Sequence, residues 1–440
     1  MGLKDLESPF LCYSDLVFGE KMKIAMDSLC CVFSNALDII EHEQLGASER
    51  HGMRIGVLSA AMGRLLGYDN DKLCAIAICA MFHDNALTEY SLAEGQDVQS
   101  SQRERNMNLH CEVGQSNVSW LPFKTNIDGF ILYHHERGNG KGPFGKREGE
   151  YPEEAALIAA ADIIDATNHL QRLPSSGLDA FKSKIDSEAE KYSTRFAMNA
   201  LLEVLDKEML EQLRDENIYQ TVESHLPRWE VELCDPSIIR VSGFAARVID
   251  YKSPFTHKHT TQIANRAWVM ADHYGYSKKD QAGLFLAAGL HDIGKIATPT
   301  EVLEKPGRLT DEEFLIIQQH VRHSHDWLGR VPGFETIRDW AADHHEKLTG
   351  NGYPFAKPAE ELDFNSRLMG CLDIYQAVCE KRPYHEARSH ADTMSILNDM
   401  AEKGLIDAKI VKDLDDVMAE HSLKDIPPPA ALSAEGSTCI

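Results

Sequence analysis

A pattern of histidines and aspartates occurs twice in this chain, and the two copies lie about 210 residues apart. The offset between corresponding residues is 208 at the start of the pattern and 210 or 211 further along, a drift that loop changes of one or two residues would explain. The first copy comprises His51, His83, Asp84, His110, His134, His135 and Asp162. The second comprises His259, His291, Asp292, His320, His344, His345 and Asp373. Histidines placed at random would not keep this register, so the chain is constrained to fold as two similar units.

The duplication also separates histidines of the pattern from others that lie near it. Three further histidines flank the second copy, namely His257, His323 and His325. None of them has a histidine at the corresponding position of the first copy, where the residues are Glu49, Val113 and Gln115. We therefore expect these three histidines to lie at the surface or behind the site.

Length and composition agree with two units. The chain has 440 residues, 43% of them hydrophobic, which suffices for more than one core at typical domain sizes of about 100–200 residues. A boundary is expected near Pro227 to Pro236. We predict a first domain over residues 1–230, a second over residues 231–426, and a flexible tail over residues 427–440, which begins with three prolines.

Charge and cysteine content narrow the class of protein. The 45 basic and 69 acidic side chains argue against attraction to polymeric nucleic acid or to an anionic membrane. The ten cysteines form no C-x-x-C pair, so neither a disulfide framework nor a thiolate metal site is indicated.

The first ten residues, MGLKDLESPF, do not resemble a signal peptide, and no apolar run approaches the ~18 residues of a membrane span. These features predict a cytoplasmic protein.

Helical periodicity with short polar breaks runs through most of the sequence, and few β-branched runs of strand type are present, so the predicted fold is all-α. Residues 277–295 are predicted to form one helix that starts at Ser277 and carries His291 and Asp292 in its last turns. A capping box at residues 310–313 should begin the helix of His320. Asp373 is expected on a helix over residues 367–378.

The second copy supplies five histidines and two aspartates, with no cysteine. Such a nitrogen and oxygen donor set suits Fe, Mn or Ni, with Zn also compatible and Mg or Ca weaker candidates. Seven ligands exceed the needs of one tetrahedral ion and predict two divalent ions. Two ions ~3.5–4 Å apart can activate water for in-line attack on phosphorus. Asp292 is the candidate bridge between the ions and a candidate catalytic residue.

A division of the ligands between the two ions follows from this bridge. One ion would be held by His259, His291, Asp292 and Asp373. The other would be held by Asp292, His320, His344 and His345.

Basic residues near the ligands are candidates for binding a phosphate. Lys295 follows His291 by four residues, so on a continuing helix its ammonium would reach the same face and stabilise a transition state. Arg382 lies nine residues after Asp373 and could form a bidentate contact with phosphate. Lys305 and Arg308 are weaker candidates.

At these residues the chain resembles the HD-GYP group of bacterial cyclic-dinucleotide phosphodiesterases. The resemblance rests on the HDIGK sequence at residues 291–295 and on Gly352, Tyr353 and Pro354. Residues 303–310, His344-His345-Glu346 and Arg382-Pro383-Tyr384 are also similar to the family, so the likeness covers roughly residues 235–425. It implies a helical HD fold, a site of two or three metals, linearisation of a cyclic dinucleotide, and substrate contacts from Lys295, Arg382 and the Gly352–Pro354 loop. Tyr353 could alternatively serve only to pack this loop.

Two departures from the family pattern bear on the metal site and the phosphate contacts. Family members with three metals carry a glutamate four residues before the first histidine ligand, where this chain has Phe255. A site of two metals is therefore expected. Some members have a basic residue three places after the arginine of the R-P-Y motif, where this chain has His385, so phosphate binding would depend more on Lys295 and Arg382.

The first copy keeps all seven ligand types but has Leu87 in place of Lys295, and Gly142-Pro143-Phe144 aligns with the Gly352–Pro354 loop. We interpret it as a degenerate HD domain that packs on the second domain and without which residues 235–440 would lose activity or solubility. Whether its seven side chains bind metal or persist as hydrogen-bonded core groups stays open.

The tandem layout resembles the Vibrio phosphodiesterases that linearise 3′,3′-cyclic GMP-AMP, here predicted to yield the linear dinucleotide pApG. One alternative is a cyclic di-GMP phosphodiesterase that yields pGpG. A second alternative is a non-catalytic nucleotide-sensing or scaffold protein, and a third is hydrolysis of a nucleotide triphosphate or monoester.

Overall fold

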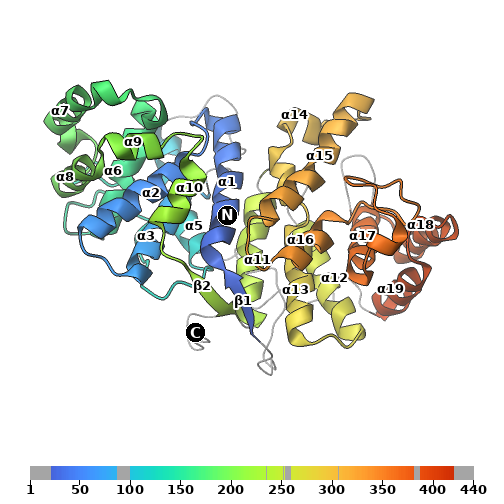
Figure 1. Cartoon of the computed structure of the whole chain (residues 1–440). Coiled ribbons are helices and arrows are strands. Elements are labelled where there is room, and N and C mark those ends of the chain that lie inside the picture. The colour runs from blue at the N-terminus through green and yellow to red at the C-terminus, as the bar shows by residue number, and fades with distance from the viewer. Residues whose placement is uncertain are drawn as a thin grey trace. The chain divides into compact units, whose positions relative to one another are not determined.

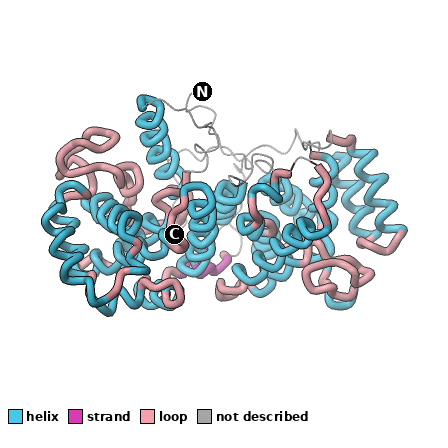
Figure 2. The backbone as a smooth tube through the Cα atoms, turned by 90° about the horizontal axis from the view of Figure 1, so that it is seen from above, coloured by secondary structure: helices cyan, strands magenta, loops and turns pink. Residues whose placement is uncertain are grey.

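The computed structural model describes residues 21–86, 100–233, 235–250, 252, 259–305, 307–380 and 387–420. The predicted positions outside these ranges are Leu87, Phe255, His257, Arg382, Pro383, Tyr384, His385 and the tail 427–440. The chain divides into two compact units, one of Met26–Glu230 and one of Met1–Ala25 with Val231–Ile440. Among the described residues the secondary structure is helical apart from two short strands (Figures 1 and 2). The predicted all-α class is confirmed.

The helices of the first unit run from blue to green in Figure 1. They are α1 (Met26–Leu45), α2 (His51–Leu65), α3 (Asn70–Met81), α5 (Ser100–Val118), α6 (Glu153–Asn168), α7 (Leu178–Glu188), α8 (Arg195–Val204), α9 (Lys207–Gln212) and α10 (Ile218–His225). Short 3-10 turns η2 (Leu170–Arg172), η3 (Ser175–Gly177) and η4 (Ala189–Lys191) connect some of them.

The helices of the second unit follow in yellow to red. They are α11 (Asp235–Asp250), α12 (His259–His273), α13 (Lys278–Leu290), α14 (Thr300–Leu303), α15 (Asp311–Leu328), α16 (Glu335–Ala342), α17 (Phe364–Cys379), α18 (His390–Glu402) and α19 (Ala408–Glu420). Two 3-10 turns, η5 (Ile293–Ala297) and η6 (Ala359–Glu361), belong to this unit. No helix in the described part of the chain is long and apolar enough to cross a membrane.

Two strands that the sequence did not predict form a two-stranded sheet, β1 (Met22–Ala25) with β2 (Glu230–Leu233). Burial alternates along β2, so Val231 and Leu233 face the core while the glutamates are exposed. Four residues are too few for this alternation to stand out in a sequence. Because β1 pairs with β2, residues 22–25 group with the second unit. The assignment of a degenerate and a catalytic domain stays a prediction.

The helices that carry the repeated pattern correspond between the units. Helices α2 and α12 begin at the first histidine of each copy. Helix α3 is N-capped by Asp69, which accepts from the Lys72 backbone N–H at 2.9 Å, and α13 is N-capped by Ser277 in the same way. Helix α5 corresponds to α15, whose capping box at Thr310 is confirmed, and α6 corresponds to α17. The duplication therefore extends from single residues to whole helices.

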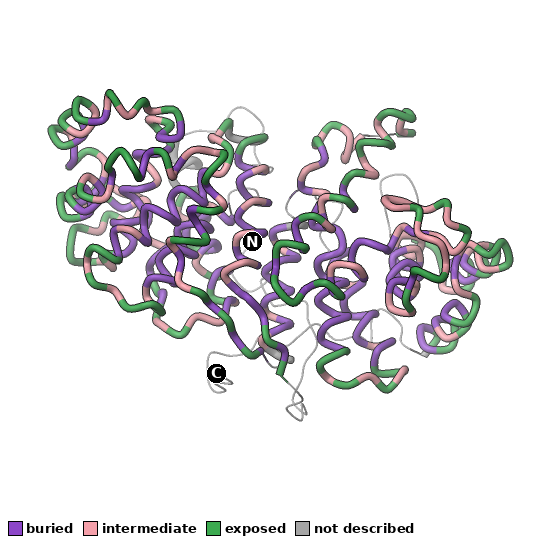
Figure 3. Tube along the Cα trace, in the orientation of Figure 1, coloured by how far each residue is buried: buried purple, intermediate pink, exposed green. Residues whose placement is uncertain are grey.

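Helix α13 forms the centre of the second unit. Every residue from Gln281 to Leu290 is buried, as the purple colouring of Figure 3 shows along the inner helices of each unit. Burial of one Leu or Phe side chain stabilises a fold by about 1.5–3 kcal/mol, so this helix is a rigid support. The ligands His291 and Asp292 follow directly at its carboxyl end.

The prediction of one continuous helix over residues 277–295 was wrong at its end. Helix α13 stops at Leu290, and the chain then forms the 3-10 turn η5. The cause lies on α15, where the Ser324 hydroxyl donates to the His291 carbonyl at 2.8 Å and accepts from the Gly294 N–H at 3.0 Å. The Ser324 hydroxyl thus binds a carbonyl and an N–H group that would otherwise form hydrogen bonds within a longer helix. The turn is therefore fixed by a residue about 30 positions further along the chain.

Candidate metal centre

The second unit brings all seven predicted ligands together from five parts of the fold. His259 opens α12, His320 lies on α15, and Asp373 lies on α17. The adjacent pair His291 and Asp292 follows α13, and the pair His344 and His345 follows α16. Six of the seven residues are buried, and His345 is partly exposed. Residues far apart in sequence thus meet at one buried point.

Asp292 lies at the centre of this cluster, with its two oxygens facing different histidines. Oδ2 lies 3.1 Å from His291 Nε2 and 3.8 Å from His259 Nε2. Oδ1 lies 3.3 Å from His320 Nε2 and 3.9 Å from His344 Nε2. A carboxylate between two sets of imidazoles is the arrangement that a bridge between two ions requires.

The remaining contacts divide the cluster into two groups. The ligand atoms of His259, His291 and Asp373 lie within 4.8 Å of one another, and so do those of His320, His344 and His345. The ligand atoms of His291, Asp292 and His344 also lie within 4.8 Å of one another, so the division expected from the sequence stays a prediction. Asp373 also reaches toward the second group, since its Oδ1 lies 3.5 Å from His259 Nε2 and its Oδ2 lies 3.8 Å from His345 Nδ1.

Backbone carbonyls orient three of the imidazoles. The Nδ1–H groups of His291, His320 and His344 donate to carbonyls three residues earlier, at 2.7, 2.6 and 2.6 Å. His259 instead donates from Nδ1 to Glu380 Oε2 at 3.0 Å. These bonds leave every Nε2 lone pair directed at the centre, as outer-shell partners do in metal sites.

Four imidazole nitrogens and one carboxylate oxygen in this cluster have no hydrogen-bond partner although they are buried. They are Nε2 of His259, His291, His320 and His344, and Oδ1 of Asp292. A buried polar atom without a partner costs about 1–3 kcal/mol, and native proteins rarely leave so many in one place. Divalent cations would satisfy all five atoms, so the side chains fit a metal centre.

Electrostatics keep the carboxylates ionised. Burial alone would raise the pKa of Asp292, but the neighbouring histidines and Lys295 hold that pKa well below its usual range. Burial would likewise raise the pKa of Asp373, and the contacts with His259 and His345 lower it well below its usual range. Both side chains are therefore anionic ligands at neutral pH.

Burial favours the neutral form of two of the imidazoles, which is the form that binds metal. Burial lowers the pKa of His344 well below its usual range and lowers that of His345 to about 3. His259 differs, because its contacts with the carboxylates of Asp373 and Glu380 outweigh the effect of burial and raise its pKa to about 9.

Lys295 lies at the site, although not as the sequence predicted. The 3-10 turn brings its ammonium 2.5 Å from Asp292 Oδ2, three residues earlier, in place of a helical contact with the His291 face. Its side chain is 20% exposed, so it reaches from the buried centre toward solvent. Lys305, by contrast, pairs with Glu313 at 2.6 Å.

The Gly352–Pro354 loop is held beside the cluster by Glu346, which the sequence did not single out. The carboxylate of Glu346 accepts from the Phe355 N–H at 2.7 Å and from the Lys357 N–H at 3.1 Å. A Cβ on Gly352 would overlap the Glu346 backbone, so this glycine serves close packing.

Aromatic rings continue from this loop to the surface. The Tyr353 ring centre lies 4.7 Å from that of His345 and 6.3 Å from that of Phe314. Phe314 is 46% exposed on α15, an unusual position for a large apolar side chain. The only sequence signal for Phe314 was an aromatic residue directly after the acidic first turn of a helix, residues 311–313.

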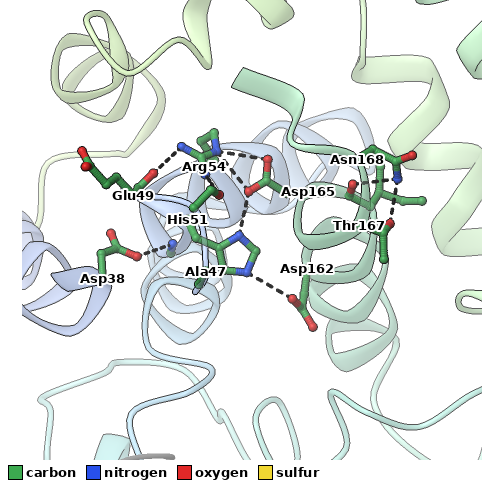
Figure 4. Close-up of polar contacts among 12 residues, drawn as sticks. Asp38, Ala47, Glu49, His51, Arg54, Asp162, Asp165, Thr167 and Asn168 are labelled. Carbon is green, nitrogen blue, oxygen red and sulfur yellow. Dashed lines mark hydrogen bonds and ion pairs between the residues drawn. The ribbon is translucent and has the colours of Figure 1, made fainter. Parts of the chain in front are cut away.

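The first unit builds a similar cluster from the first copy of the pattern. Asp84 Oδ1 lies 3.0 Å from His110 Nε2 and 3.7 Å from His134 Nε2, and Oδ2 lies 3.3 Å from His83 Nε2. Figure 4 shows His51 between two aspartates, with Nδ1 2.6 Å from Asp165 and Nε2 3.2 Å from Asp162. Arg54 also binds Asp165. In the first unit Asp165 on α6 therefore orients His51, whereas in the second unit Glu380 orients His259.

The loop after this cluster shows what the first unit has lost. Glu136 accepts from the Phe144 and Lys146 N–H groups at 2.6 and 2.7 Å, as Glu346 does from Phe355 and Lys357. Gly142 matches Gly352, since a Cβ on either would overlap the glutamate. Phe144 therefore corresponds to Phe355, whereas the sequence alignment had paired it with Pro354. With this correction, the loop of the first unit is one residue shorter than that of the second. Only Pro143 lies between Gly142 and Phe144, so Tyr353 has no counterpart.

Comparison with known proteins supports this geometry. The HD domain family matches residues 35–186 and 244–410. The chain is 27% identical to the 3′3′-cGAMP-specific phosphodiesterase 1 of Vibrio cholerae over 82% of its own length and 85% of that protein. It is 25% identical to a cyclic di-GMP phosphodiesterase of Thermotoga maritima, over 62% of this chain and 76% of the relative.

A solved structure resembles the fold along nearly the whole chain. The crystal structure of a cyclic GMP-AMP specific phosphodiesterase of Vibrio cholerae matches with a TM-score of 0.63 and 18% sequence identity, covering 90% of this chain and 98% of that one. With both copies of the histidine pattern inside the matched ranges, the chain belongs to the HD domain family.

Proposed function

We propose that the second unit binds two divalent metal ions and hydrolyses one phosphodiester bond of 3′,3′-cyclic GMP-AMP to give linear pApG. The observation that carries this proposal is the position of Asp292, whose two oxygens face separate groups of histidines. When bound, the ions supply Lewis acidity and an activated water for attack on phosphorus. Fe, Mn and Ni suit this donor set.

The chain's own residues fix the geometry of the reaction. His291, His320 and His344 are held by backbone carbonyls, so little reorganisation is needed when charge develops in the transition state. Lys295 extends from Asp292 toward solvent and can meet a phosphate oxygen there. Arg382, which lies outside the described residues, is proposed as a second phosphate contact.

Tyr353 and Phe314 form the aromatic edge of the site. Aromatic faces bind nucleobases by stacking with little sequence preference. An exposed ring beside a partly buried one gives a platform that a base could cover. We assign this edge to one base of the cyclic dinucleotide.

The choice of substrate rests on the relatives. The relative that is similar along most of both chains, and the structural neighbour that spans both units, are named for cyclic GMP-AMP. Cyclic di-GMP remains the second candidate, because the Thermotoga relative is named for it and a relative from Xanthomonas campestris, 34% identical over 32% of this chain and 38% of that protein, is also named for it.

The first test is a substrate comparison. Purified full-length protein with Mn²⁺ is incubated separately with 3′,3′-cyclic GMP-AMP, cyclic di-GMP and cyclic di-AMP, and products are separated by chromatography. We expect linearisation of cyclic GMP-AMP at the highest kcat/KM. Faster conversion of cyclic di-GMP would replace the substrate but keep the reaction, whereas no turnover by protein with measured metal would overturn the proposal in favour of a sensor.

A second prediction concerns Lys295. Lys295→Gln removes the charge and leaves a polar side chain that is one atom shorter, so we expect kcat to fall ~10²-fold, the loss seen when one donor to a transition-state charge is removed. Metal content should stay unchanged. Lys409→Gln, which alters an exposed ammonium paired with Asp413, is the control. An unchanged kcat in the Lys295 variant would exclude the proposed phosphate contact.

A further inference from the structure

The first unit contains a potential metal ligand that the second unit lacks. Cys111 follows His110 on α5 and is fully buried. Its counterpart by the duplication is Val321, which follows His320 on α15 and is equally buried. The thiol therefore occupies a place where the related unit has only an apolar side chain.

This thiol lies within the histidine cluster. The ligand atoms of His110, Cys111, His134 and His135 all lie within 4.8 Å of one another. In a tetrahedral zinc site with bond lengths of ~2.0–2.3 Å, the ligand atoms lie ~3.3–3.6 Å apart. Side-chain movements of about 1 Å would bring all four atoms to bonding distance of one ion.

Several side chains in and beside this group have buried polar atoms without a hydrogen-bond partner. These atoms are both ring nitrogens of His110, Nε2 of His83, Nε2 of His134 and Oδ1 of Asp84. His110 and His134 are each at most 1% exposed. Asp84 Oδ1 lies 3.0 Å from His110 Nε2 without forming a hydrogen bond. A cation bound by His110 and His134 would give the buried ring nitrogens that face it a partner, and Asp84 beside them would add a negative charge close to that cation.

The two units differ in the chemistry of their donors. Three imidazoles and one thiolate are the ligands of a tetrahedral zinc site, and a thiolate selects softer ions than carboxylates do. His134 is oriented by a bond of 2.6 Å from Nδ1 to the Ile131 carbonyl, as an imidazole ligand requires. The second unit offers only nitrogen and oxygen donors.

We infer that the first unit binds a structural ion of the zinc class through His110, Cys111, His134 and His135. The ion would fasten helix α5 to the segment that carries the paired histidines. Four protein ligands close a tetrahedral site, leaving no position for water or substrate. The absence of a Tyr353 counterpart, described above, agrees with a role in structure and not in hydrolysis.

Cobalt spectroscopy tests this inference without reference to turnover. Co²⁺ replaces zinc in tetrahedral sites and, unlike d¹⁰ zinc, reports a thiolate ligand by a charge-transfer band in the near ultraviolet. Full-length protein loaded with Co²⁺ should show this band. Cys111→Ser should abolish it and remove about one metal ion per chain, as expected for a site that depends on four closed ligands.

Two matched variants complete the experiment. Cys79→Ser alters another fully buried thiol of the first unit and should keep the band, as should Asp292→Asn in the second unit. Absence of the band in cobalt-loaded wild type, or its survival in Cys111→Ser, would overturn the inference. Because neither readout uses activity, this outcome is independent of whether the second unit hydrolyses a cyclic dinucleotide.

Discussion

Asp292→Asn should abolish phosphodiesterase activity while leaving the fold intact. Loss of an outer-shell partner in a metal site costs ~10–100-fold in affinity or activity, and Asp292 faces both groups of histidines directly. Its replacement would remove one anion from both of the proposed ions, so we expect more than ~100-fold loss of kcat/KM and reduced metal content. Steady-state kinetics with metal analysis of the same preparation measures both effects.

The variant needs a control that removes a carboxylate elsewhere in the same unit. Asp326 lies on α15 with 56% of its side chain exposed and contacts His325. Asp326→Asn should therefore keep wild-type activity and metal content. A folded Asp292→Asn protein that turned over substrate at the wild-type rate would disprove the proposed role of Asp292 as the bridging carboxylate.

The cluster in the second unit could be predicted because the chain can be compared with itself. A histidine kept in register in two copies occupies the same place in both units, and the structure brings the fourteen residues of the pattern into two clusters. Helix starts could be predicted for a similar reason. Caps such as Ser277 and Thr310 are local, since each side chain bonds a backbone group three residues away.

Features that depend on contacts between distant segments could not be predicted. Ser324 ends α13 from another helix, so the position of Lys295 followed from tertiary structure and not from helical periodicity. Glu346 orders its loop through backbone groups that carry no side-chain signal. Cys111 was not predicted because candidate ligands were selected as residues shared by both copies. The second copy has Val321 at this position, so a ligand present in one copy alone was left out.

One difference between the two units lies just after α13 and α3. Gly294 in the second unit packs so closely on α15 that a Cβ would overlap the His320 carbonyl oxygen and lie 2.7 Å from the Ser324 nitrogen. The first unit has Ala86 at this position, so its backbone must keep a wider separation there. The close approach in the second unit packs η5 against α15, the helix that carries His320.

Gly294→Ala should therefore both destabilise the protein and impair the site. Both atoms that the new methyl group would meet belong to the backbone and cannot rotate away, so η5 must move from α15. Such overpacking costs about 1–3 kcal/mol, and chemical denaturation with metal analysis should show a lower midpoint together with lost metal.

Gly283→Ala is the matched control, because its Cβ would lie 3.4 Å from Met22 and 3.5 Å from Trp340, ordinary contact distances. Within α13, replacing this glycine by alanine favours the helix by up to ~1 kcal/mol. If both variants lost the same amount of stability and metal, Gly294 would have no special role in holding η5 against α15.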